Sequence, residues 1–137
     1  MSEIRDINLW ESGKRKIDWV KRNMPVLSSI EQEFIEEKPF KGIKIALSVH
    51  LEAKTAYLCM VFASGGAEMY VTGSNTLSTQ DDVAAALVKE GLNVFGWYNA
   101  SEEEYERHLC SVLECGPDII IDDGGDLTNL MHTRFTH

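Results

Sequence analysis

The sequence has few cysteines and no long apolar run, and each shortage excludes a class of protein. Its three cysteines form neither an even disulfide set nor the paired spacing of a zinc site. We therefore expect reduced thiols and no metal ligation. No stretch approaches the roughly 20 apolar residues of a membrane span, and Glu3, Arg5 and Asp6 stand where a signal peptide has its apolar core. These absences favour a soluble, cytoplasmic protein without a membrane partner.

Basic charge is also scarce. Thirteen Lys and Arg stand against 22 Asp and Glu, and the resulting net charge of −9 argues against a general nucleic-acid binder, because nothing offsets phosphate repulsion. One basic cluster lies within residues 14–22, at helical spacing with Trp10, Ile17 and Val20, and is predicted to be the solvated face of an amphipathic helix. The length of 137 residues and the hydrophobic content of 44% predict a single domain over 1–137 with one well-formed core.

Apolar spacing predicts two helices followed by alternating strands and helices. The first two helices are expected near 8–24 and 26–37, with Pro25 as the break between them. The predicted strands are 43–49, 68–72, 93–97 and 117–121, and the predicted helices that follow them are 54–63, 80–90, 101–114 and 128–132. Strands joined by single helices form right-handed crossovers and a parallel sheet. The predicted fold class is α/β: a three-layer open parallel sheet, Rossmann-like with about four βα units, preceded by two amino-terminal helices.

Polar side chains follow three of the predicted strands. The first strand leads into His50 and the segment 50–55, the second into the loop 73–81, and the fourth into the turn 122–126, which holds three aspartates and two glycines. The carboxyl ends of parallel strands share one edge of the sheet, and ligands bind in the crevice beyond that edge. We therefore interpret this edge as a nucleoside site.

Each of these groups also has a structural interpretation. His50 can be a hydrogen-bonded structural histidine, the loop 73–81 can be turn and helix-cap chemistry, and the pair Glu52 and Lys54 can be an exposed first helical turn. Asp122 or Asp126 can cap the last helix. Dinucleotide, P-loop, esterase-elbow and zinc-protease motifs are absent from the sequence. The occurrence of polar groups at consecutive strand ends favours the site.

Three segments carry a family resemblance. His50–Ala56 reads HLEAKTA, Ser78–Asp81 reads STQD, and Asp122–Thr128 reads DDGGDLT. With these motifs in this order, the chain resembles S-adenosylhomocysteine hydrolase, also called adenosylhomocysteinase, over residues 5–133. The resemblance implies reversible cleavage of S-adenosylhomocysteine to adenosine and homocysteine. In this family tightly bound NAD oxidises the ribose 3′ hydroxyl, which acidifies the 4′ proton and allows homocysteine to leave.

The resemblance also implies roles for individual residues. His50 and Asp123 correspond to an acid/base pair near the ribose and the leaving group. Thr79 and Gln80 are expected to line the nucleoside pocket, with Asn75 and Ser78 supporting their loop. The implied substrate-binding residues are Glu52, Lys54, Thr55, Asn75, Ser78, Thr79 and Gln80.

The sequence departs from the family pattern in two ways. Many relatives carry threonine at the position of Glu52 and glutamate at that of Lys54. Because Lys54 can only donate, it suits the carbonyl oxygen of hypoxanthine better than an amine, which makes S-inosylhomocysteine an alternative substrate.

The second departure concerns length. Family members continue well beyond 137 residues, into an NAD domain and the rest of the substrate domain. We therefore expect the chain to be the amino-terminal part of the substrate-binding domain, without bound NAD and inactive alone. A homo-oligomer, a separate chain carrying the NAD domain, and a non-catalytic nucleoside-binding or partner-binding module remain open alternatives.

Overall fold

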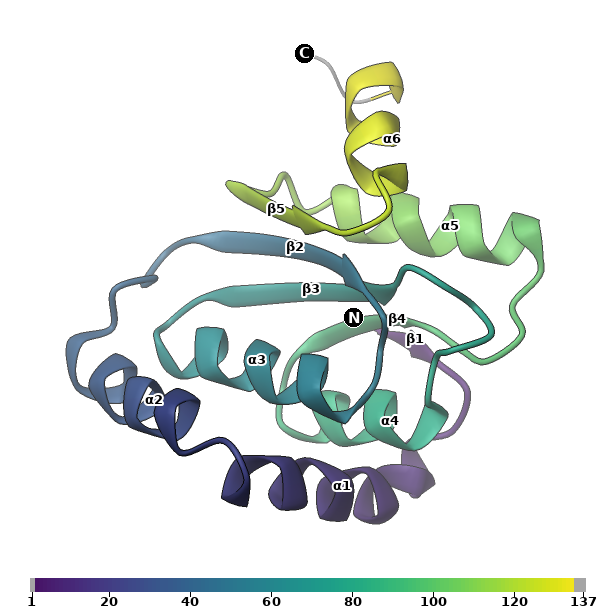
Figure 1. Cartoon of the computed structure of the whole chain (residues 1–137). Helices are drawn as coiled ribbons and strands as arrows, with labels where there is room; N and C mark the ends of the chain where they lie inside the picture. Colours follow the sequence, from purple (N-terminus) through teal and green to yellow (C-terminus); the bar gives the residue numbers. More distant parts are fainter. Residues whose placement is uncertain (1, 135–137) are drawn as a thin grey trace.

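Five parallel strands form an open sheet in the order β1-β4-β3-β2-β5, with helices on both faces (Figure 1). The computed structural model describes residues 2–134. The strands are β1 (Glu3–Ile4), β2 (Lys44–Val49), β3 (Glu68–Gly73), β4 (Asn93–Gly96) and β5 (Ile119–Asp122). A short 3₁₀ turn, η1 (Ile7–Leu9), precedes the helices α1 (Trp10–Arg22), α2 (Pro25–Glu37), α3 (Ala53–Ser64), α4 (Asp81–Lys89), α5 (Glu102–Leu113) and α6 (Asp126–Arg134). The predicted α/β fold with four βα units and two leading helices is confirmed.

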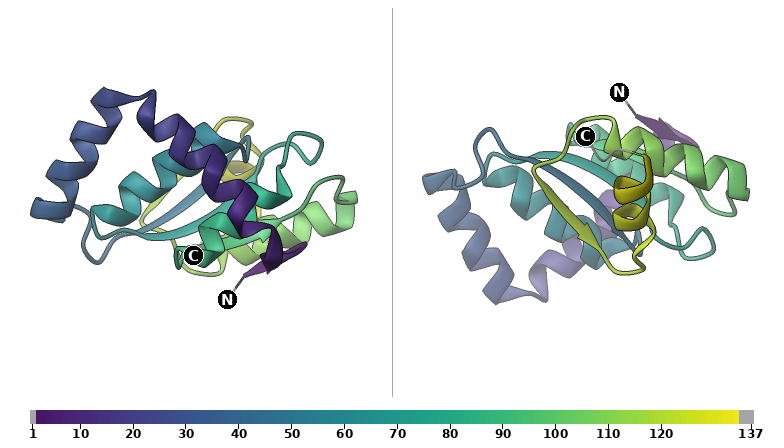
Figure 2. Two further views of the ribbon diagram at one scale, coloured as in Figure 1. Left: turned by 90° about the horizontal axis from the view of Figure 1, so that it is seen from below. Right: turned by 90° about the horizontal axis from the view of Figure 1, so that it is seen from above.

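The two faces of the sheet are covered unequally. Helices α3 and α4 pack on one face, and α1 and α2 form a further layer outside them, whereas α5 and α6 cover the other face (Figures 1 and 2). Within residues 2–134, no helix is long and apolar enough to cross a membrane.

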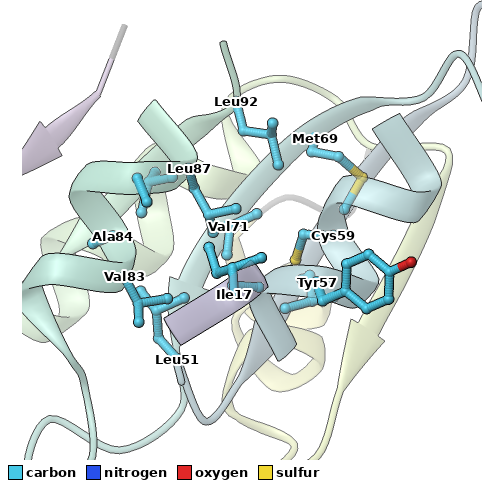
Figure 3. Close-up of a cluster of buried hydrophobic side chains, with 14 of the residues drawn as sticks. Ile17, Leu51, Tyr57, Cys59, Met69, Val71, Val83, Ala84, Leu87 and Leu92 are labelled. Atoms are coloured by element: carbon cyan, nitrogen blue, oxygen red, sulfur yellow. The ribbon is translucent and has the colours of Figure 1, made fainter. Parts of the chain in front are cut away.

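The side chains of β2 alternate between two hydrophobic cores, one on each face of the sheet. Ile45 and Leu47 point to the side of α1, α3 and α4, while Ala46 between them packs with residues of α5 and α6. Figure 3 shows the larger core, in which Val71 of β3 and Leu87 of α4 lie among the buried side chains. A strand that is buried on both faces has no polar alternation, which explains the continuous apolar runs in the sequence.

Helix α1 approaches α4 very closely. The α1 residue Gly13 is buried, and a Cβ added to it would lie 1.9 Å from the carbonyl oxygen of Asp82. Asp82 accepts a hydrogen bond from Ser12 Oγ at 2.7 Å and pairs with Lys16 Nζ at 2.8 Å. The absence of a side chain at position 13 therefore sets the distance between these two helices.

The basic cluster of α1 is an exposed helix face, as predicted. Lys14 pairs with Asp18 at 2.8 Å, and Lys21 lies 3.3 Å from the buried carboxylate of Glu31. Buried charges need such partners, so part of this face serves the packing of α1 against α2.

Several predicted boundaries are wrong by a few residues. The first helix starts as the 3₁₀ turn η1, and Pro25 is the first residue of α2, a position that tolerates proline because its N–H has no helical acceptor. The last strand is shifted towards the site, to Ile119–Asp122 instead of 117–121, and α6 begins at Asp126 instead of Thr128.

Strand β1 was not predicted. Its two residues pair with Phe95 and Gly96 of β4, and Glu3 is held by the side chain of Arg107 on α5. The hydrogen bond from Arg107 lowers the pKa of Glu3 below its ordinary value. Residues 3 and 4 are thereby held at the edge of the sheet.

Candidate functional site

The site lies where the strand order reverses. From β2 the chain moves outward to β3 and β4, and then returns across the sheet to β5 on the other side of β2. The loops after β2 and β5 therefore lead to opposite faces of the sheet at its carboxyl edge, which is the usual ligand position in open parallel sheets. His50 follows β2, and Asp123 follows β5.

His50 connects three loops of this edge. Its Nδ1 lies 2.7 Å from Ser78 Oγ, in the loop after β3, and its Nε2 lies 3.9 Å from Asp123 Oδ2. The Ser78 hydroxyl donates its single proton to the Asn75 carbonyl at 3.2 Å, so it accepts from Nδ1–H of the histidine. The other ring nitrogen, Nε2, faces the Asp123 carboxylate.

The two adjacent aspartates after β5 have different surroundings. Asp122 accepts hydrogen bonds from the backbone N–H groups of Gly124 at 3.2 Å, Gly125 at 3.1 Å and Thr128 at 3.0 Å. Asp122 thus organises the turn into α6, which confirms the capping interpretation for this residue. Asp123, by contrast, turns its carboxylate towards His50.

The third aspartate of the turn is also engaged. Asp126 accepts a hydrogen bond of 2.8 Å from the Tyr105 hydroxyl of α5. Burial, with the carboxylate of Asp126 beside it, raises the pKa of Tyr105. This contact ties α6 to α5 rather than opening Asp126 to a ligand.

Glu52 caps α3. Its Oε1 accepts from the backbone N–H of Thr55 at 3.1 Å and from the Thr55 hydroxyl at 3.3 Å. Lys54, one residue before Thr55, is exposed and makes no ion pair within the described part of the chain. The structure thus satisfies Glu52 internally, whereas the Lys54 side chain is exposed.

The loop after β3 is built around Asn75. Its side-chain oxygen accepts from the Leu77 N–H at 2.8 Å, and its carbonyl accepts from the hydroxyl of the buried Thr79 at 3.1 Å. Close contact between Thr79 and β3 requires glycine at position 73, where a Cβ would lie 2.5 Å from Thr79 Oγ1. Gln80, at the end of the loop, accepts a hydrogen bond of 3.2 Å from Lys16.

A cavity of about 800 Å³ opens beside these loops and is lined by His50, Glu52, Lys54, Leu77, Ser78, Thr79, Gln80 and Tyr98. This volume is in the range of small-molecule sites. Thr55, Asn75 and Asp123, which are also predicted site residues, are not among the residues that line this cavity. Leu77 and Tyr98 were not predicted, since neither carries a titratable group suited to the chemistry. The signal for Tyr98 is its position after a predicted strand, at the same edge as the others.

Fold and site together define an α/β protein with a candidate ligand site at the switch point of an open parallel sheet, where a histidine and a carboxylate lie at the carboxyl edge. The chain belongs to the S-adenosyl-L-homocysteine hydrolase family, whose model matches residues 1–137.

Curated relatives give the same family under two names. The chain is 57% identical over 136 residues to the S-inosyl-L-homocysteine hydrolase of Methanocaldococcus jannaschii, covering 99% of this chain and 33% of that protein. It is 52% identical over 136 residues to the S-inosyl-L-homocysteine hydrolase of Methanococcus maripaludis, with the same coverage of 99% and 33%. It is also 52% identical over 131 residues to the adenosylhomocysteinase of Pyrococcus abyssi, covering 96% of this chain and 31% of that protein. The chain therefore spans about a third of the length of the curated relatives it matches.

Proposed function

We propose that this chain is the amino-terminal part of the substrate-binding domain of an S-adenosyl-L-homocysteine hydrolase, or of its S-inosyl-L-homocysteine counterpart. The reaction is the reversible cleavage of the thioether to a nucleoside and L-homocysteine. The observation that carries the proposal is the placement of His50 between Ser78 and Asp123 at the switch point of the sheet. Membership of the family supports it.

His50 is the group that moves protons near the ribose and the sulfur. Its Nδ1–H is tied to Ser78, so the ring is oriented and Nε2 is directed into the site. The Asp123 carboxylate, 3.9 Å from Nε2, stabilises the imidazolium that forms when the ring takes a proton. The pair therefore suits both directions of a reversible proton transfer.

The residues present do not fit the NAD that this family uses. A Rossmann-type dinucleotide site places the pyrophosphate at the N-terminus of the helix after the first strand of the unit. Here the α3 N-terminus, after β2, is capped by the Glu52 carboxylate, which bonds to the Thr55 N–H and would repel a phosphate. The NAD site accordingly belongs to another part of the family's longer proteins, and this sheet binds the nucleoside.

The function of the isolated chain is therefore substrate binding without turnover. We expect no NAD-dependent cleavage of S-adenosyl-L-homocysteine or S-inosyl-L-homocysteine by the purified chain. Release of homocysteine, measured with a thiol reagent in the presence of NAD, would contradict the proposal that the isolated chain binds substrate without cleaving it.

Calorimetric titration with adenosine and inosine tests the site itself. We expect saturable binding of at least one nucleoside, weakened when Asp123→Asn removes the charge beside His50. Asp126→Asn is the matched control, because Asp126 bonds to Tyr105 instead of facing His50. Absence of binding by the folded chain, or equal losses in both variants, would contradict the proposed site.

Lys54 favours hypoxanthine as the base. Its ammonium lines the cavity, has no acidic partner in the described residues, and donates hydrogen bonds only, as the C6 oxygen of hypoxanthine requires. The names of two close relatives agree with this preference. We expect inosine to bind more tightly than adenosine and Lys54→Glu to reverse the order, whereas the control Lys14→Glu, on the outer face of α1, leaves it unchanged. If the Lys54→Glu chain still binds inosine more tightly than adenosine, residues other than Lys54 recognise the base.

The open edge of β5 is the place where we propose that further protein joins this sheet. Among the described strands β5 pairs only with β2, and Ile119 at its start is 39% exposed. An exposed apolar strand edge invites pairing with another segment. A later part of a longer chain, a separate chain with the NAD domain, or a second copy would each satisfy it. Sedimentation of the purified chain at several concentrations separates self-association from the other two.

A further inference from the structure

The loop between β4 and α5 is fixed to the candidate site by contacts from three parts of the chain. Asp81, the first residue of α4, accepts the Tyr98 N–H at 2.8 Å, and Arg5 donates to the Tyr98 carbonyl at 2.8 Å. Arg5 Nε also pairs with Asp81 at 3.2 Å, which closes a ring of contacts around the Tyr98 backbone. The next residue, Asn99, has a left-handed φ of 60° and donates its N–H to the carbonyl of Thr76 at 2.8 Å. Tyr98 is thus held against the loop after β3.

Tyr98 and Leu77 form the apolar part of the cavity. Both line it, and their side chains are largely open, with exposed fractions of 49% for Tyr98 and 65% for Leu77. The other lining side chains are polar or charged. A fixed backbone that presents two open apolar side chains towards a cavity favours an apolar portion of a ligand.

The order of the strands locates these two side chains relative to the chemistry. Asp123 follows β5 and His50 follows β2, whereas Leu77 follows β3 and Tyr98 follows β4. The apolar pair therefore lies on the side of His50 away from Asp123. The cavity of about 800 Å³ also has room for more than a nucleoside.

We propose that Tyr98 and Leu77 contact the methylene and thioether chain of the homocysteine moiety, and that Arg5 is a positioning residue that holds Tyr98 for this contact. The inference rests on the proposed function. In a substrate made of a base, a sugar and an amino-acid chain, the CH₂–S–CH₂–CH₂ segment is the flexible apolar part. A polarizable sulfur packs favourably against an aromatic ring. With the base at Lys54 and the ribose at His50, this segment is the portion left for Leu77 and Tyr98.

The test compares each thioether with its own nucleoside. S-inosyl-L-homocysteine and inosine, and S-adenosyl-L-homocysteine and adenosine, are titrated calorimetrically into the purified chain without NAD. Tyr98→Ala and Leu77→Ala are expected to weaken binding of the thioether by about two- to tenfold, the range of a sulfur–aromatic or small apolar contact, with nucleoside affinity unchanged. Tyr98→Phe keeps the ring and is expected to bind like the parent chain. Val26→Ala is the control, because Val26 is 74% exposed on α2 and does not line the cavity.

Arg5→Ala is expected to reproduce the selective loss of Tyr98→Ala. In the same variant, hydrogen exchange of the backbone amides of 98 and 99 should accelerate, while circular dichroism shows an intact fold. Equal losses for thioether and nucleoside, or no loss for either, would overturn the assignment of Tyr98. A parent chain that binds nucleoside no differently from thioether would overturn the homocysteine subsite alone, whereas a parent chain that binds neither overturns the proposed function, and this inference with it.

Discussion

Replacing Gly13 by alanine should force α1 away from α4. The new Cβ would stand 1.9 Å from the backbone oxygen of Asp82, where nothing flexible can yield, and real Cβ contacts are essentially never below 3.0 Å. Helix α1 must therefore retreat by about 1 Å or more, which loosens the packing of Ile17 and Val20, both buried on the same helix.

The sign of the effect depends on two opposing contributions. Alanine favours the helix over glycine by about 1 kcal/mol. Overpacking a filled interface costs about 1–3 kcal/mol, and partial loss of two buried aliphatic contacts adds about 1–2 kcal/mol. The expected net result is a loss of about 2 kcal/mol in the free energy of unfolding.

Urea unfolding followed by far-ultraviolet circular dichroism measures this loss. Arg15→Ala, at an exposed position on the same helix, is the control and should change the free energy of unfolding by no more than about 0.5 kcal/mol. A Gly13→Ala chain as stable as the parent, or more stable, would show that helix propensity outweighs the contact and would refute the argument.

Further predictions concern burial, pH and the loop after β3. Tyr57→Phe removes a hydroxyl that donates to the buried Glu31 at 2.9 Å, so urea unfolding should show a loss of about 1–3 kcal/mol, and an unchanged midpoint would contradict the contact. Burial raises the pKa of Asp82, but the hydrogen bonds from Lys16 and Ser12 lower it further, to a net value below the ordinary one. The contribution of Asp82 to stability is therefore present above about pH 4 and is lost as the pH falls through the lower pKa of the folded state. The Asp82→Asn chain should lose less stability than the parent between pH 4 and lower pH, as measured by urea unfolding at each pH. The same pH dependence in both chains would show that Asp82 does not cause the loss. Gly73→Ala places a Cβ 2.5 Å from Thr79 Oγ1, so nucleoside affinity measured by calorimetry should fall severalfold, and an unaltered affinity would show that the loop absorbs the clash without moving the site.

The fold was largely predictable because its signals are local. Runs of branched residues that end in polar groups define the strands, and single helices between them imply a parallel sheet, as observed for β2 to β5. Strand β1 escaped prediction because two residues carry no period, and its pairing with β4 depends on chain more than 90 residues away. The ends of β5 and α6 were misplaced because Asp122 caps the turn through backbone N–H groups that the sequence does not display.

The candidate site also has a part that the sequence predicted and a part that it did not. Placement of His50 and Asp123 at one edge follows from the parallel sheet and was predicted, and the structure places His50 Nε2 3.9 Å from Asp123 Oδ2. The family resemblance, rather than the local pattern, singled out Asp123 from its identical neighbour Asp122, and the turn gives the two side chains different surroundings, with Asp122 on backbone N–H groups and Asp123 facing His50. The position of the Tyr98 backbone depends on hydrogen bonds with Arg5 and Asp81, and only the tertiary structure brings these residues together.

The attachment of the first residues to β4 and α4 also constrains the order of events during synthesis. Strand β1 has its partners in Phe95 and Gly96, and α1 packs chiefly on α4, so residues 3–22 leave the ribosome long before most of their contacts can form. Strands β2 and β3, joined by α3, are the earliest pair able to form. The amino-terminal segment therefore completes its docking only after residue 96 has emerged, and until then Ile17 and Val20, which are buried in the folded chain, lack their partners on α4.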